Sequence, residues 1–168
     1  ANEQNITFLL WNTTSEVNRT TFTDLRREIN FTNLANGDYW YNVTIVDIAN
    51  NMNTTATYKI RLDIVNPNGT LYLPVNNSYV NNRTQNLSVN ATDNIGLVNV
   101  TLYVWNATAL VNSTTQTVSG LQSLLGIVYT FLYDGVFKWF YRIVDTANNA
   151  FTTTNNTINV DTVYPLLT

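Results

Sequence analysis

A segment of 32 residues occurs twice in this chain, and its two copies lie 98 residues apart. The copies run from 36 to 67 and from 134 to 165, and 13 of their 32 positions are identical without a gap. A period on the order of 100 residues matches the length of one β-sandwich domain and is typical of chains built from consecutive modules. The repeat therefore predicts two modules of one kind rather than a single larger fold.

Each copy opens with a stretch in which apolar and polar residues alternate. The alternate positions carry large apolar side chains, namely Tyr39, Tyr41, Val43 and Ile45 in the first copy and Phe137, Trp139, Tyr141 and Ile143 in the second. A period of two residues predicts a strand with one face toward a core. The turn Asp-x-Ala-Asn-Asn, at 47–51 and 145–149, then predicts a hairpin into a last strand, 56–64 or 152–162.

The same alternation predicts the remaining strands. In the first module the predicted strands are 5–11, 17–23, 28–34, 38–48 and 56–64. In the second module they are 71–73, 85–92, 97–105, 109–118 and 127–133, and the two strands of the repeated hairpin bring the total to seven.

A boundary between the modules is predicted at the turn sequence Asn66-Pro67-Asn68-Gly69. The first module then covers 1–66, and the second covers 67–168, with a short tail at its end. In this alignment residue 1 corresponds to residue 95, so the first module has no counterpart of 67–94. We therefore expect the first module to lack its two opening strands.

Several short motifs mark the strand ends and turns of both modules. They are Gly37-Asp-Tyr39, Asp47-Ile-Ala-Asn50-Asn51, Ala91-Thr-Asp93-Asn-Ile-Gly96, Gly135 with Asp145-Thr-Ala-Asn148-Asn149, and Asp161-Thr-Val-Tyr-Pro165. This set resembles the immunoglobulin-like repeat domains of archaeal and bacterial cell-surface proteins, which include S-layer and extracellular filament proteins. The chain departs from that pattern by carrying Asn in the turn where Gly is usual, and Asn also tolerates a positive φ.

The resemblance implies an all-β fold of two tandem immunoglobulin-like β-sandwich modules, the first lacking its two opening strands. It also implies an extracellular or cell-surface location. An Asn- and Thr-rich chain without Cys favours an archaeal surface protein.

The composition argues against several classes of function. Only 11% of the residues are charged and the net charge is −3, which removes the basic surface expected of a nucleic-acid-binding protein. The absence of His and Cys excludes Ser-His-Asp, Cys-His and His-metal catalysis, and we predict no enzymatic activity. No apolar run of about 18 residues is present, so no membrane span is expected in this chain.

The most abundant chemical signal is the sequon Asn-x-Ser/Thr, the acceptor of N-linked glycans. It occurs fifteen times, at Asn5, Asn12, Asn18, Asn30, Asn42, Asn53, Asn68, Asn76, Asn82, Asn86, Asn90, Asn99, Asn106, Asn112 and Asn155. One interpretation is dense N-glycosylation of a secreted protein. The alternative is that strand alternation itself produces Asn-apolar-Thr/Ser with both polar residues outward. It accounts for strand cases such as Asn5, Asn42, Asn86 and Asn99, but not for Asn12, Asn18, Asn68, Asn82 or Asn112.

Two other groups of residues are candidates for binding. Asp93, Asp145 and Asp161 fall near predicted strand ends and could supply oxygen ligands to Ca²⁺, the one cofactor considered, although carboxylates that cap their own turns give the same pattern. Asp47 and Asp63 occupy the positions of Asp145 and Asp161 in the first copy. Trp11, Trp40 and Trp105 fall on the face opposite the predicted core or at strand ends, where they could contact sugars or a neighbouring subunit, or pack at the edge of the core.

We expect a structural subunit of an extracellular filament or surface layer that is N-glycosylated and associates with copies of itself. The incomplete first module favours head-to-tail joining by a donated strand. The candidate donor is the tail Val163, Tyr164, Pro165, Leu166, Leu167 and Thr168. An alternative origin of the incomplete module is excision from a longer array of repeats, and an alternative function is that of an adhesin or glycan-binding surface protein.

Overall fold

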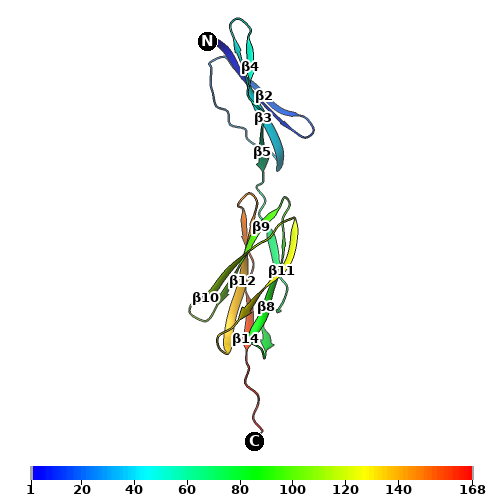
Figure 1. The fold of residues 1–168 in the computed structure, drawn as a ribbon, viewed down its shortest axis with the longest axis vertical. Helices are drawn as coiled ribbons and strands as arrows, with labels where there is room; N and C mark the ends of the chain where they lie inside the picture. Colours follow the sequence, from blue (N-terminus) through cyan, green and yellow to red (C-terminus); the bar gives the residue numbers. More distant parts are fainter. Residues whose placement is uncertain (1, 168) are drawn as a thin grey trace. The chain divides into compact units, whose positions relative to one another are not determined.

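The computed structural model describes residues 2–167, and all regular elements in this range are β-strands. The predicted all-β class is therefore confirmed. The chain divides into two compact units, residues 1–64 and 65–168, each with its own sheets (Figure 1). Among the described residues, no helix has the length and apolar character needed to cross a membrane.

The first unit contains one antiparallel sheet. Its strands are β1 (Glu3–Asn12), β2 (Glu16–Phe22), β3 (Gly37–Asp47), β4 (Met52–Thr54) and β5 (Tyr58–Leu62). They lie in the order β2-β1-β3-β4, and β5 pairs with β3 beside β4. The alternating apolar residues of β1 and β3 share one face, since Phe8 pairs with Val43 and Ile6 with Ile45 across the two strands.

The second unit contains two sheets. Its strands are β6 (Asn68–Leu71), β7 (Ser78–Val80), β8 (Thr84–Thr92), β9 (Leu97–Trp105), β10 (Leu110–Thr117), β11 (Gln122–Thr130), β12 (Gly135–Asp145), β13 (Ala150–Thr152) and β14 (Asn156–Val160). One sheet has the order β10-β9-β12-β14-β7, with β13 also on β12, and the other has the order β11-β8-β6. Together the two sheets form a β-sandwich.

In the second unit, the strands differ from the predicted ones in three places. The second unit has nine strands where the sequence predicts seven, because the three-residue strands β7 and β13 are too short to show an alternating pattern. Strand β6 begins at Asn68, inside the predicted turn. Strand β11 begins at Gln122 instead of residue 127, because it pairs with β8 along its whole length, from Gln122 with Thr92 to Thr130 with Thr84.

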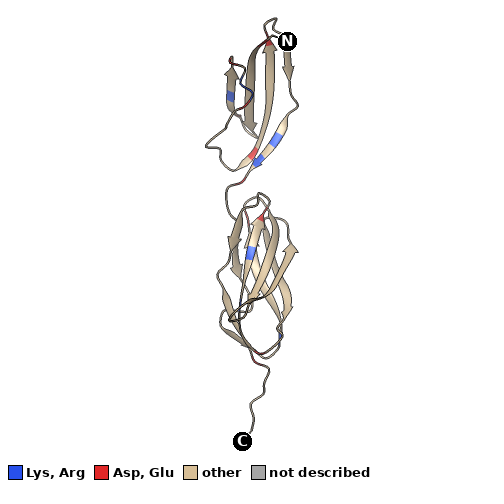
Figure 2. Cartoon of the chain, turned by 90° about the vertical axis from the view of Figure 1, so that its left-hand side faces the viewer, with Lys and Arg blue, Asp and Glu red and all other residues tan. Residues whose placement is uncertain are grey.

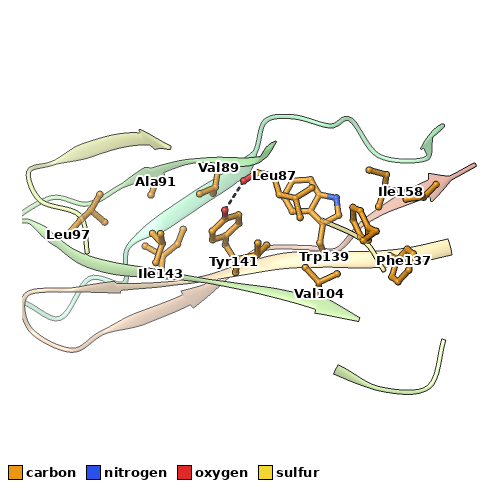
Figure 3. Close-up of a cluster of buried hydrophobic side chains, with 14 residues drawn as sticks. Leu87, Val89, Ala91, Leu97, Val104, Phe137, Trp139, Tyr141, Ile143 and Ile158 are labelled. Carbon is orange, nitrogen blue, oxygen red and sulfur yellow. Dashed lines mark hydrogen bonds between the residues drawn. The ribbon is translucent and has the colours of Figure 1, made fainter. Parts of the chain in front are cut away.

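The core of the second unit lies between its two sheets (Figure 3). Strand β8 contributes Leu87, Val89 and Ala91, which are fully buried against the aromatic residues of β12. The Tyr141 hydroxyl donates a hydrogen bond of 2.7 Å to the carbonyl oxygen of Leu87 and so ties the two sheets together. Burial raises the pKa of Tyr141 above its ordinary value.

The sheet of the first unit has a counterpart, strand by strand, in the larger sheet of the second. Strands β1, β2, β3, β4 and β5 correspond to β9, β10, β12, β13 and β14. The registers agree as well: Tyr39 pairs with Ile60 as Phe137 pairs with Ile158. In the described part of the first unit, no strand corresponds to β6, β7, β8 or β11.

The predicted strand 28–34 is wrong, because residues 23–36 form no strand. The counterpart of β11 falls in this segment, and β11 is hydrogen-bonded to β8 alone. Without a partner in the position of β8, the segment has nothing to pair with. It is held instead by single contacts, including an ion pair of Arg27 with Glu3 and a hydrogen bond of 2.8 Å from the Tyr39 hydroxyl to the Ala35 carbonyl oxygen.

The matched positions Ile158 and Ile60 provide a test of this difference. Ile158 has no exposed surface, so we expect Ile158→Ala to cost the second unit about 2–5 kcal/mol of unfolding free energy. Ile60 is 47% exposed, so we expect Ile60→Ala to cost the first unit less than about 1 kcal/mol. Native-state hydrogen exchange of the full chain, followed at the amides of β12 and β3, measures the two units separately. If both substitutions lowered the unfolding free energy of their units equally, the core of the first unit would be as well covered as that of the second.

Candidate functional site

The inner face of the first unit's sheet is incompletely covered. Its residues Tyr41, Val43 and Ile45 are half-buried. Their counterparts in the second unit, Trp139, Tyr141 and Ile143, are fully buried. The first unit's sheet consists of β2, β1, β3, β4 and β5. We refer to its inner face as the open face. It carries the apolar pattern of a sandwich core without the second sheet that would bury it.

A hollow of about 320 Å³ lies on the open face. It is lined by Phe8, Leu9, Arg27, Glu28, Ile29, Phe31, Tyr41, Asn42 and Ile60. Most of these side chains are apolar, and the unpaired segment 23–36 forms one wall. An extended segment of another chain could place alternate apolar side chains in this hollow, which is how strand addition combines affinity with specificity.

The predicted donor is exposed. Residues 161–167 form no strand, and the side chains of Val163, Tyr164, Leu166 and Leu167 are almost completely accessible. Thr168, the last residue of the predicted donor, lies outside the described residues. The tail side chains are therefore exposed, whereas the open face is covered in part. Its residues Ile6, Phe8, Leu10 and Tyr39 are buried, and segment 23–36 lines the hollow.

None of the fifteen sequon asparagines is buried. Eight are exposed, namely Asn18, Asn30, Asn53, Asn68, Asn76, Asn82, Asn86 and Asn155, and the other seven are partly exposed. The amide nitrogen, the atom to which a glycan is joined, donates a hydrogen bond at Asn106 and Asn112. The surface positions of these side chains are compatible with glycosylation.

The structure also gives some sequons a structural role. In four sequons, the threonine hydroxyl forms a hydrogen bond of 2.8–3.0 Å with a threonine hydroxyl on the neighbouring strand. The pairs are Thr7 with Thr21, Thr44 with Thr54, Thr84 with Thr130, and Thr101 with Thr115. In turns, the Asn12 side-chain oxygen accepts bonds from Thr14 and Ser15, and Asn106 repeats the arrangement. Strand alternation does not explain the sequon at Asn12, but these turn hydrogen bonds do.

The Asp-x-Ala-Asn-Asn turn has the same hydrogen bonds in both units. One oxygen of Asp145 accepts the backbone N–H groups of Ala147 and Asn149, and the other accepts the Asn149 amide. Asp47 makes the matching bonds in the first unit, and the Asn51 side chain and backbone N–H hold the pKa of Asp47 below its usual value. These carboxylates cap their own turns.

The three calcium candidates do not form one cluster. Carboxylate oxygens of Asp93 and Asp145 lie within 4.8 Å of one another. Asp161 follows β14 near the opposite end of the eleven-residue strand β12, about 30 Å away by strand length. Calcium takes six to eight oxygen ligands, and both oxygens of Asp145 already accept hydrogen bonds.

The three candidate tryptophans, unlike the core residue Trp139, lie on the outer faces of the sheets. Trp11 and Trp40 are cross-strand neighbours on β1 and β3, both partly exposed, and the Lys59 ammonium lies 5.3 Å from the Trp40 ring centroid. Trp105 is exposed at the end of β9, opposite Lys138. Neighbouring indole side chains are of the kind that can stack on a sugar ring.

One surface was missed in the sequence analysis. Leu124 and Val128, on β11, are both more than half exposed. The predicted strand 127–133 begins too late to include Leu124. The available signal was the absence of charge, since no Asp, Glu, Lys or Arg occurs from 94 to 133.

Comparisons with known proteins identify the fold. No family model matches the chain, and no curated protein matches it. Among solved structures, the chain is similar to the fibronectin(III)-like modules of Clostridium thermocellum CbhA, with a TM-score of 0.52 and 17% sequence identity. The match covers 95% of this chain and 78% of that one. The chain thus has an immunoglobulin-like fold of the fibronectin type, and at this identity the likeness shows the fold alone.

Asn148 tests whether the turn needs its positive φ of 68°. Ala is strained in this conformation, so we expect Asn148→Ala to lower the unfolding free energy of the second unit by about 1 kcal/mol. Asn148→Gly should leave it nearly unchanged or raise it, because glycine has no such strain. Urea unfolding of the full chain measures both. At Asn81, an exposed position without a positive φ, glycine should bring no gain. If Asn148→Gly and Asn81→Gly changed the unfolding free energy by the same amount, the proposed role of the turn would be contradicted.

Proposed function

We propose that the chain is a structural subunit of an extracellular filament or surface layer, in which copies join head to tail by strand donation. The observation that carries this proposal is the open face. It combines a sandwich-type apolar pattern, a hollow on the inner side and a segment, 23–36, that lacks a strand partner. Exposed apolar surface with unpaired backbone groups is a site for strand addition.

The tail from Val163 to Thr168 is the donor in this proposal. By the 98-residue repeat, 166–168 correspond to 68–70, which are the first residues of strand β6. In the second unit, β6 pairs with β8 on the side of the core opposite β12. The tail thus has the sequence position of an opening strand, which is the kind of strand that the open face lacks. The tail of each copy then binds the open face of the next copy. This contact is heterologous, so it can repeat along a line without closing.

N-linked glycans on the sequon asparagines complete the proposal. The chain has few charges, so its solubility depends on neutral polar groups. Sugars joined to exposed asparagines add such groups and shield the outer faces of the strands. Glycosylation of this kind places the protein outside the cytoplasm, at the cell surface.

Adhesion is a second candidate, and the adjacent Trp11 and Trp40 favour it. In that case the outer face of β1 and β3 binds a glycan, with the two indole rings as the platform. Trp11→Ala would then abolish binding on a glycan array. Strand donation uses the inner face of the same strands, so Trp11→Ala leaves it intact.

Head-to-tail association is tested with the exposed tail residues Leu166 and Leu167. In sedimentation velocity of the full, unglycosylated chain, we expect oligomers that lengthen with concentration. The variant L166D/L167D should associate at least about tenfold more weakly, because two carboxylates would have to be buried in an apolar hollow. Tyr79 and Leu132 are also highly exposed, and Y79D/L132D provides the same change of charge elsewhere.

The control variant Y79D/L132D should assemble like the original chain. A synthetic peptide of residues 161–168 should shorten the oligomers by occupying the open face. If the original chain stays monomeric at every concentration, or if the control loses assembly as fully as the tail variant, strand donation by the tail is wrong.

Glycosylation is tested by the intact mass of native material. We expect a mass well above the 19.0 kDa of the polypeptide, because many exposed sequons are available. Asn86→Gln should remove the mass of one glycan. Asn94→Gln, at an exposed asparagine outside any sequon, should change the mass only by the substitution itself. A native mass equal to that of the bare chain would exclude glycosylation.

A further inference from the structure

Strand β11 forms a free edge of the three-stranded sheet in the second unit. It pairs with β8 on one side, and no other strand of the described residues pairs with it. Just before the strand, the carbonyl oxygen of Leu121 accepts a hydrogen bond from the N–H of Asp93. Just after it, the N–H of Phe131 donates a hydrogen bond to the carbonyl oxygen of Arg83. Because bonding direction alternates along an antiparallel strand, the odd residues face β8 and the even residues face the free edge. The N–H and C=O groups of Leu124, Gly126 and Val128 therefore point outward from the sheet.

This edge lacks the features that protect the other edges. Charged residues or sequon residues occur in or directly beside the other edge strands, namely β2 (Glu16, Asn18, Arg19), β4 (Asn53), β5 (Lys59, Arg61), β6 (Asn68), β7 (Asn76, Ser78) and β10 (Asn112). Among the described strands, β11 is the one edge of more than three residues that has neither. Figure 2 shows how few charged residues the strands of this unit carry. Natural sheets use charges at edges to prevent association with another strand.

The sequence of β11 is complementary to itself when read in the antiparallel direction. The nine residues are Gln-Ser-Leu-Leu-Gly-Ile-Val-Tyr-Thr, with Gly126 at the centre. Around a two-fold axis at Gly126, Leu124 faces Val128 of the second copy, Leu125 faces Ile127, and Gln122 faces Thr130. Each apolar residue of the central five thus meets an apolar residue, and no pair brings like charges together.

The free backbone groups fit the same axis. A two-fold axis through an antiparallel pair can pass through a hydrogen-bonded pair of identical residues, which requires that residue to face the edge. Gly126 is an even residue and meets this requirement. A side chain at Gly126 would collide with Asn86, since a Cβ atom there would lie 2.0 Å from the Asn86 side-chain oxygen. Gly126 therefore brings no side chain of its own to the middle of the edge, and the Asn86 side chain occupies the space beside it on the outer face.

We propose that two copies of this chain pair along β11, antiparallel and in the register that places Gly126 opposite Gly126. The two three-stranded sheets then become one six-stranded sheet across an isologous interface. The exposed side chains of Leu124 and Val128, at 60% and 66%, meet across the two-fold axis on the outer face. The pairing does not depend on strand donation to the first unit, because it uses a different unit and a different edge.

The experiment uses the full, unglycosylated chain carrying L166D/L167D, which removes the tail contact. Sedimentation equilibrium should show a dimer of twice the 19.0 kDa chain mass. Adding L124K/V128K places like charges opposite each other in the proposed register, so the dimer should weaken at least about tenfold. Adding L124K/V128E instead places opposite charges across the interface, and dimerisation should return to within about threefold of the starting chain.

The matched control is V98K/V136K, which adds two lysines at exposed valines of the other sheet. This control should dimerise like the starting chain. In a parallel pairing, like positions face each other, so L124K/V128E would bring Lys opposite Lys and Glu opposite Glu. If the L124K/V128E variant dimerises as weakly as L124K/V128K, the antiparallel register is wrong. A starting chain that stays monomeric, or a control as weak as L124K/V128K, overturns the proposal itself.

Discussion

A β-strand in a soluble protein needs a neighbour that pairs with its backbone and a layer that covers its apolar face. In this chain, β8 meets both needs for the second unit. Its backbone pairs with β6 and β11, and its side chains Leu87, Val89 and Ala91 cover β12. The first unit builds the same sheet in the same register, yet no strand of its described residues takes the place of β8. The exposure of Ile60, the hollow beside Phe8 and the irregular segment 23–36 all follow from that single difference.

Much of this fold could be predicted from the sequence because the repeat and the alternation act locally. Strand β9 has the bounds that its pattern predicts, and the two copies of the hairpin place their turns at Asp47 and Asp145. The failures share a physical cause. Residues 28–34 alternate like a strand but have no partner, β11 begins where β8 allows pairing, and β7 is a three-residue strand held by parallel pairing to β14. Pairing across the sheet, which a single strand's sequence does not contain, decides each of these cases.

The candidate sites were predictable to the extent that they depend on one segment. The turn sequence predicts that one of its two adjacent asparagines tolerates a positive φ, and the structure shows which one, Asn50 in the first copy and Asn148 in the second. The grouping of Asp93 with Asp145, and the distance of both from Asp161, depends on which ends of the strands meet and was not predictable from spacing. Sequons show the same limit. Their number is read directly from the chain, but the cross-strand bond of Thr7 with Thr21 appears only once β1 and β2 are paired.

The low charge of the chain leaves few charged groups to oppose the pairing of its strand edges with another strand. Most edges carry sequon asparagines, and β5 carries Lys59 and Arg61, so neutral or charged polar groups limit pairing there. Strand β11 has no charged or sequon residue, whereas the hollow of the open face has Arg27 and Glu28 beside its apolar residues. The two proposed contacts also differ in symmetry. A strand placed on the open face joins one end of a copy to another end of the next, so this contact repeats along a line. The β11 edge pairs with itself and closes after two copies. A chain with both contacts can therefore extend in one direction and join its neighbours side by side, which is the minimum that a filament bundle or a surface lattice requires.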